Sequence, residues 1–97
     1  MSEFKNEIYA SKVINDQPEN FTGLEVTGVR YTGKMTDDDE KEVIVDNANP
    51  EFFSCYLRHK DGRALSCADF GNAAEAVAYG QRLADTHSWT FENKLPA

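Results

Sequence analysis

Two stretches decide the fold of this chain: FFSCYLRHKDGRALSCADF, residues 52–70, and NAAEAVAYGQRLADTH, residues 72–87. The first holds two runs rich in apolar and aromatic residues, 52–59 and 64–70, on either side of Asp61-Gly62. Asp-Gly favours a two-residue hairpin turn because both residues tolerate positive φ. We therefore predict a β-hairpin over residues 52–70.

The position of the turn fixes the register of this hairpin. It predicts three cross-strand pairs: Phe53 with Phe70, Cys55 with Ala68, and Leu57 with Ser66. This register places Cys55 and Cys67 on opposite faces, whereas a one-residue bulge would bring them opposite each other. A disulfide is geometrically possible in the second case but is not predicted. We expect two free thiols in a reducing compartment.

The second stretch predicts a helix over about residues 73–87. Asn72 followed by Glu75 is the spacing with which two side chains satisfy the free backbone N–H groups of a first helical turn. Residues at helical spacing then form a stripe of mostly small side chains that suits close contact with a sheet; they are Ala76, Val77, Gly80, Leu83, Ala84 and His87. The alternating Trp89 and Phe91 beyond the helix indicate a short returning strand.

The first half of the chain is less regular. We expect a strand over 21–31 broken at Gly28, a short strand at 43–45, a turn at 16–19, and a polar loop over 33–42. Residues 4–14 fit a strand or a helix equally well. The expected fold is a single α+β domain spanning residues 1–97, an antiparallel sheet of about 4–5 strands with one main helix packed on one face.

The charge of the chain is strongly asymmetric. Residues 1–51 hold twelve acidic and five basic residues, while residues 52–97 hold five of each, so the whole net charge of −7 lies in the first half. Such a field repels nucleic acid and membranes and attracts basic protein surfaces. A basic leader followed by an apolar run is absent from the first residues, so we expect a cytoplasmic protein in a bacterial host cell.

The motifs of catalysis, metal binding and cofactor binding are weak or absent in this sequence. Asp37-Asp38-Asp39-Glu40 lacks the calcium-loop glycine, because Glu42 stands where the glycine belongs. The two histidines and two cysteines lack zinc spacing, and nothing marks a third group that would orient His87 as a base for Cys55. The basic group around the hairpin turn (Arg58, His59, Lys60 and Arg63) is interpreted as a solvated tip. We expect no enzyme activity, no metal and no cofactor.

The acidic residues are the best candidates for a partner-binding surface, because carboxylates can take the place of phosphates in a groove lined by Lys and Arg. The candidates, with one aromatic anchor, are Asp16, Glu19, Glu25, Asp37, Asp38, Asp39, Glu40, Glu42, Asp46 and Tyr31. Glu51 adds a further charge, and Phe52 and Tyr56 are further aromatic anchors near these charges. A solubilising acidic face is the alternative interpretation.

A short acidic domain of about this size with a three-aspartate loop resembles the small anti-CRISPR proteins of phages and mobile elements, in particular the DNA-mimicking inhibitors of type I-F surveillance complexes. The resemblance implies a non-enzymatic inhibitor that occupies the positively charged DNA site of Cascade subunits. It implies no direct contact with nucleic acid and no membrane association. No residue roles follow from it, because such inhibitors share no sequence pattern.

Residues 52–92 also resemble small bacterial domains and an accessory subunit of respiratory complex I. The resemblance rests on the hairpin turn, on helix residues such as Tyr79 and Leu83, and on Trp89, which is expected to open the last strand. It implies the hairpin, helix and strand unit. It leaves open a second function, that of an accessory or structural protein-interaction domain whose acidic face keeps it soluble. An enzyme that uses Cys55 or His87 is the third hypothesis.

Overall fold

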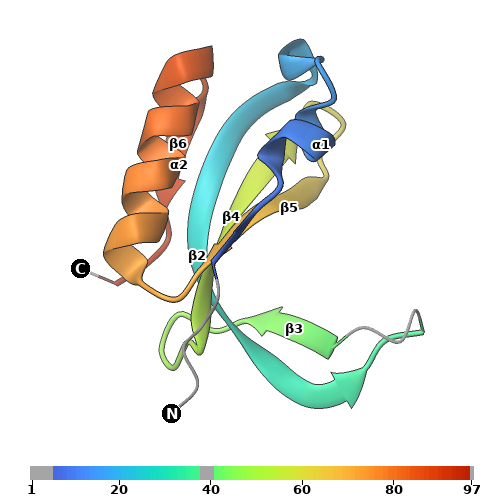
Figure 1. Ribbon diagram of the computed structural model, residues 1–97, viewed down its shortest axis with the longest axis vertical. Coiled ribbons are helices and arrows are strands. Elements are labelled where there is room, and N and C mark those ends of the chain that lie inside the picture. Colours follow the sequence, from blue (N-terminus) through green and yellow to red (C-terminus); the bar gives the residue numbers. More distant parts are fainter. Residues whose placement is uncertain (1–5, 38–40, 97) are drawn as a thin grey trace.

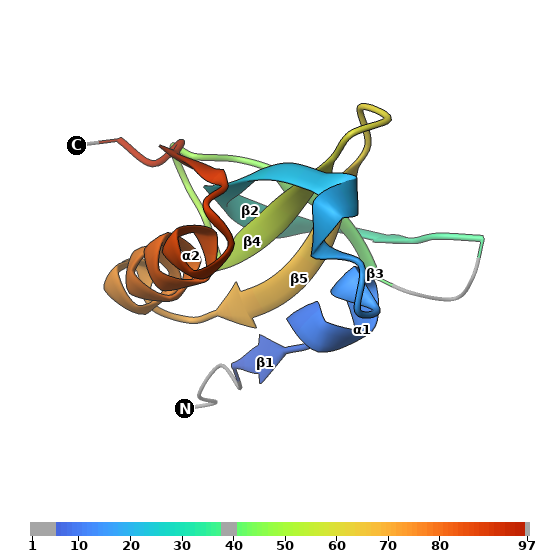
Figure 2. The same ribbon diagram turned by 90° about the horizontal axis from the view of Figure 1, so that it is seen from above.

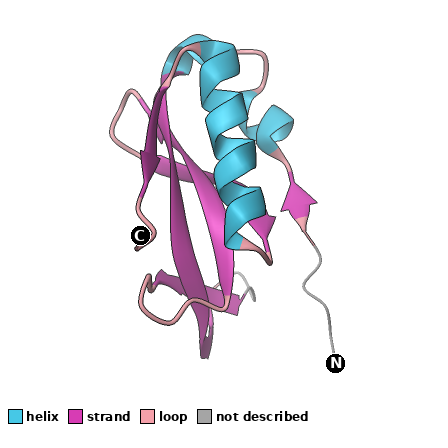
Figure 3. Cartoon of the chain, turned by 90° about the vertical axis from the view of Figure 1, so that its left-hand side faces the viewer, coloured by secondary structure: helices cyan, strands magenta, loops and turns pink. Residues whose placement is uncertain are grey.

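The structure is a computed structural model that describes residues 6–37 and 41–96. Its elements are β1 (Glu7–Ile8), α1 (Ala10–Ile14), the short 3-10 helix η1 (Pro18–Asn20), β2 (Phe21–Met35), β3 (Lys41–Val45), β4 (Phe52–His59), β5 (Ala64–Phe70), α2 (Ala73–His87) and β6 (Thr90–Asn93). Within the described residues, six strands form one sheet in the order β1-β5-β4-β2-β3, with β6 paired to β2. Helix α2 packs along one face of this sheet (Figures 1 and 3). The predicted α+β fold is confirmed, with the addition that β6 runs parallel to β2 and makes the sheet mixed.

The β4–β5 hairpin forms as predicted up to its middle. The first two expected pairs are present, Phe53 with Phe70 and Cys55 with Ala68. These residues face α2, because the side chains of a strand alternate between the two faces of its sheet. The turn has three residues and not the expected two, because the His59 backbone N–H donates to the Arg63 carbonyl at 2.8 Å and Lys60, Asp61 and Gly62 lie between them, with Gly62 at φ of 99°.

The third expected pair, Leu57 with Ser66, is wrong because the hairpin contains a β-bulge. The register shifts after Cys55, so that Leu57 pairs with Leu65 and Cys67 is the extra residue. A bulge turns its extra side chain to a new direction. Here it buries Cys67 beside Cys55; both side chains have no exposed surface, and both thiols are free.

Helix α2 has the predicted bounds and one half of the predicted cap, because the Glu75 carboxylate accepts from the Asn6 Nδ2 at 2.9 Å instead of from the first helical turn. The Asn72 side chain accepts a hydrogen bond from the Glu75 backbone N–H at 3.1 Å, and Ser88 ends the helix in the left-handed conformation. The small stripe faces the sheet, where Ala76, Gly80 and Ala84 are fully buried; this explains why residues without long side chains occupy these positions.

The segment at residues 4–14 contains both elements that the sequence left open, because β1 pairs with β5 and α1 follows at once. The turn expected at 16–19 is present, with Asp16 at φ of 58° and η1 beginning at Pro18.

The break expected at Gly28 is wrong. Strand β2 continues through it, and a side chain there would meet the Pro50 Cβ at 2.7 Å. Glycine is therefore required at 28 by the close approach of the segment after β3, and not by a bend.

Candidate partner-binding surface

The last part of β2 and the whole of β3 form a hairpin that projects from the body. We call this hairpin the hairpin arm, and it comprises residues 30–37 and 41–45. Strand β4 pairs with β2 only up to Val29, so beyond that residue β2 pairs with β3 alone in the described chain. Figures 1 and 2 show the arm extending away from the body, on the side opposite α2. The polar loop expected over 33–42 is therefore partly wrong, because β2 continues to Met35 and β3 begins at Lys41.

The arm carries most of the large hydrophobic side chains that are exposed in the described chain. Of the five large hydrophobic side chains that are exposed, four belong to it: Met35, Val43, Ile44 and Val45. Met35 and Val45 are each 60% exposed. Because neighbours in a strand point to opposite faces, Val43 and Ile44 make both faces of β3 apolar. Exposed apolar surface that gathers on one projecting element is typical of a site that binds another protein.

Among residues 6–37 and 41–96, no further strand pairs with the outer edge of β3. The Asp46 backbone N–H donates to the Gly28 carbonyl at 2.9 Å, which places the even-numbered backbone groups of β3 toward β2. The backbone N–H and C=O groups of Val43 and Val45 therefore point to the free edge. Open edges of this kind take up an added strand from a partner, unless charge or proline blocks them.

At the base of the arm, on the face of the sheet opposite α2, lies a hollow of about 330 Å³ that we call the aromatic hollow. Four of its nine lining residues are aromatic, and most of the others are polar: Tyr9, Tyr31, Lys41, Val43, Phe52, Ser54, Tyr56, Ser66 and Asp69. The rings of Tyr31 and Phe52 have centroids 5.1 Å apart, and the Lys41 Nζ lies 5.2 Å from the Tyr31 centroid. The three aromatic anchors expected from the sequence thus come together in one site.

A polar network closes one side of the aromatic hollow. The Tyr9 hydroxyl lies 2.7 Å from the Ser66 Oγ and donates to Asp69 Oδ2 at 3.2 Å, while the Ser54 hydroxyl donates to Asp69 Oδ1. Burial raises the pKa of Tyr9 to about 12, and the Asp69 charge adds to the shift. Burial likewise raises the pKa of Tyr56, with Asp69 contributing. The hollow therefore combines neutral phenols with one carboxylate.

The candidate carboxylates do not form one continuous face. Asp16 and Glu19 are exposed just before β2, whereas Asp37 and Glu42 belong to the arm beyond the other end of this fifteen-residue strand. Asp38, Asp39 and Glu40 lie outside the described residues. A duplex-like row of charges along the whole molecule is therefore not formed by the described carboxylates, and the arm is the part with the densest acidic sequence.

Two of the candidates are engaged within the fold. Asp46 accepts from the Arg30 Nε at 2.7 Å and from the backbone N–H of Asn49 at 3.0 Å. These hydrogen bonds hold the pKa of Asp46 below its usual range. Glu25 lies 3.4 Å from an Arg58 guanidinium nitrogen. Both carboxylates position the chain locally, Asp46 at the base of the arm and Glu25 on the face of the aromatic hollow.

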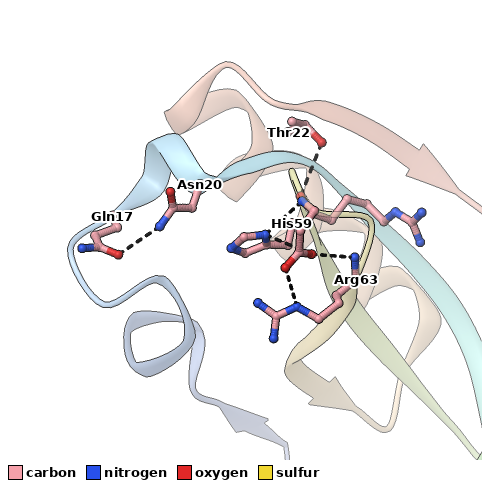
Figure 4. A network of polar contacts seen from close by, with 7 residues as sticks. Gln17, Asn20, Thr22, His59 and Arg63 are labelled. Carbon is pink, nitrogen blue, oxygen red and sulfur yellow. Dashed lines mark hydrogen bonds and ion pairs between the residues drawn. The ribbon is translucent and has the colours of Figure 1, made fainter.

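The basic group at the β4–β5 turn is held by local contacts (Figure 4). Asp61 accepts from the Arg63 backbone N–H and from its Nε at 2.7 Å, and these contacts lower the pKa of Asp61. The Lys60 backbone N–H donates to the Asn20 carbonyl, which ties the turn to η1. The tip is thus tied to the body by its backbone, and Arg63 is paired with Asp61.

The two thiols are buried in the core, and the two histidines pack against aromatic rings. Burial raises the pKa of Cys55 to about 12 and that of Cys67 further still, so both thiols are protonated at neutral pH and are poor nucleophiles. His87 stacks on Trp89 with centroids 4.4 Å apart, and His59 meets the edge of Phe21. In the described part of the chain, no three His, Cys, Asp or Glu side chains gather closely enough to hold a metal ion.

Sequence reasoning missed the apolar arm and six of the nine residues that line the aromatic hollow, among them Tyr9 and Asp69. A signal for the arm existed in Val43-Ile44-Val45, because three consecutive apolar residues must expose at least one when a strand has solvent on one face. No local signal connects Tyr9 with Asp69, which are sixty residues apart.

None of the helices in residues 6–37 and 41–96 is long and apolar enough to cross a membrane. Comparison with protein families, curated proteins and solved structures gives no match for this chain.

Proposed function

We propose that this protein is a non-enzymatic inhibitor that docks its hairpin arm on a basic, DNA-binding surface of a partner protein in the bacterial cytoplasm. The observation that carries the proposal is the coincidence on the arm of exposed apolar side chains, a free strand edge and the acidic sequence between β2 and β3. Apolar side chains supply affinity at the centre of an interface, and surrounding carboxylates select a basic partner.

The partner class comes from the charge. A net charge of −7 that arises from residues 1–51 favours a partner surface rich in Lys and Arg, and a DNA-binding groove is such a surface because it neutralises phosphates with these residues. The DNA site of a type I-F CRISPR surveillance complex is the specific partner that we propose. In this proposal the carboxylates that take the place of DNA phosphates are those of the arm, since Asp16 and Glu19 lie at the other end of β2.

The test is a competition measurement with purified type I-F surveillance complex and a fluorescently labelled target duplex. The wild-type chain is expected to displace the duplex, and a Val43→Ser, Val45→Ser double variant is expected to compete at least tenfold less well because it loses apolar contact. The matched control is Ile8→Ser, which removes an apolar side chain that is 58% exposed from β1, at the edge of the sheet opposite β3. Full displacement by the arm variant, or no displacement by the wild type, contradicts the proposal.

The second candidate, an accessory domain that binds a partner mainly through apolar contacts, is favoured by Met35 and Ile44, which need no basic surface. Salt separates the two functions. The screening length falls from about 10 Å at 0.1 M to about 3 Å at 1 M salt, so a charge-driven complex weakens steeply while an apolar complex persists.

A further inference from the structure

We propose that the aromatic hollow is a binding site for a cationic side chain, lysine or arginine, presented by the basic partner. The inference rests on the proposed function for the source of the cation, and it adds a contact at the base of the arm, where Tyr31 and Lys41 of the arm meet Phe52, Tyr56 and Asp69 of the body. Aromatic faces attract cations within about 6 Å of the ring centroid, most strongly where water is excluded.

A cation already lies on this face. The Lys41 Nζ is 5.2 Å from the Tyr31 centroid, within the attractive range. Lys41 is exposed and comes from β3, so it stands at the mouth of the hollow and can move aside without disturbing the core. The Tyr31 ring is in turn backed by Phe52, which is only 4% exposed and holds it in place.

Asp69 supplies the negative charge inside the site. It is half-buried and accepts hydrogen bonds from the hydroxyls of Ser54 and Tyr9, which are neutral groups. Among the ion pairs of the described residues, none includes Asp69. A half-buried carboxylate without a cation gains more from an incoming charge than an exposed one does, because the surrounding dielectric is lower.

The size and charge of the hollow select the occupant. About 330 Å³ is at the lower limit of pockets that hold small molecules, which suits one side chain better than a large ligand. Asp69 disfavours an anion, and the aromatic walls favour a cation with an alkyl or planar body over a hydrated inorganic ion. Arginine and lysine meet both conditions.

The experiment is a ¹H–¹⁵N NMR titration of the full chain with Nα-acetyl-arginine amide, with the neutral isostere Nα-acetyl-citrulline amide as the matched probe. The arginine probe is expected to shift the signals of Tyr31, Phe52, Tyr56 and Asp69, and the citrulline probe to bind about tenfold less tightly. Asp69→Asn keeps the shape and one of the two hydrogen-bonding oxygens, so it should fold and yet lose about tenfold in affinity for arginine. Asp85→Asn removes the same charge from the exposed side of α2 and should change nothing.

Two further pairs of variants separate ring and charge effects. Tyr31→Phe keeps the ring and should retain binding, whereas Tyr31→Leu should reduce it severalfold. Lys41→Ala removes the resident cation and should tighten binding severalfold, while Lys34→Ala removes an equal charge from the same arm and should not.

Shifts confined to Asp37, Glu42 and their neighbours, or an affinity unchanged by Asp69→Asn, would overturn the inference and leave the proposed function standing. Arginine binding in the hollow combined with no competition against DNA would overturn the proposed function and leave the site.

Discussion

Gly80 is the residue through which α2 contacts both β2 and β6. A Cβ at this position would lie 2.8 Å from the Leu24 Cδ2, 2.9 Å from the Phe91 Cε1 and 3.0 Å from the Val26 Cγ2. Real Cβ atoms do not approach carbon so closely. Leu24 and Val26 are 1% and 0% exposed, so they have no free space into which to move. We therefore predict that Gly80→Ala destabilises the protein.

Two opposing effects set the size of the change. Alanine is favoured over glycine in a helix by about 1 kcal/mol, whereas overpacking of a well-filled core costs about 1–3 kcal/mol. We expect a net loss of about 1 kcal/mol in the free energy of unfolding, which lowers the melting temperature by about 4–8 °C in a domain of this size.

Urea unfolding followed by circular dichroism measures the effect. The control is Ala78→Gly on the exposed side of α2, which should lose only the helix preference of alanine, about 1 kcal/mol. If Gly80→Ala instead stabilises the protein by that same amount, α2 does not lie as close to the sheet as described, and the reasoning is refuted.

The remaining predictions concern the thiols, the base of the arm and the helix cap. Cys55 and Cys67 should resist alkylation in the native protein and react fully in denaturant, and rapid labelling of the native protein would contradict their burial. Because folding raises the pKa of both thiols, the free energy of unfolding should also fall as the pH rises above about 8.5. The pKa of Asp46 is lowered by folding, so its stabilising contribution is present above about pH 4 and lost below it. The Asp46→Asn variant should therefore lose less stability on acidification than the wild type. Urea unfolding at pH 3 and pH 6 measures the difference. Asn72→Ala should cost about 1 kcal/mol, whereas Asn72→Ser should cost little; equal losses would show that the cap contributes nothing.

The elements that local sequence determines were predictable. The Asp61-Gly62 turn and the Asn72 cap each act within a few residues, so the β4–β5 hairpin and α2 follow from the sequence with the right bounds. The bulge at Cys67 did not follow, because it depends on which side chain the core accepts beneath α2. The unbroken β2 at Gly28 depends on Pro50, which approaches only in the folded chain.

The candidate site was predictable in composition and not in arrangement. The sequence indicates acidic residues and three aromatic anchors, and the structure brings Tyr31, Phe52 and Tyr56 together. It also separates Asp16 from Asp37 by the length of β2, a distance that charge counting does not contain. The exposure of Val45 depends on where β4 begins to pair with β2, which no local pattern specifies.

The most direct test of the docking arm is a charge-swap comparison in the DNA competition assay. One variant carries Lys at Asp37, Asp38 and Asp39, and the other carries Lys at three exposed carboxylates elsewhere, Glu75, Asp85 and Glu92, so that both change the net charge equally. We predict that the first variant no longer displaces the duplex from the surveillance complex, while the second competes nearly as well as the wild type. Equal competition by the two variants would contradict the assignment of the arm as the docking surface.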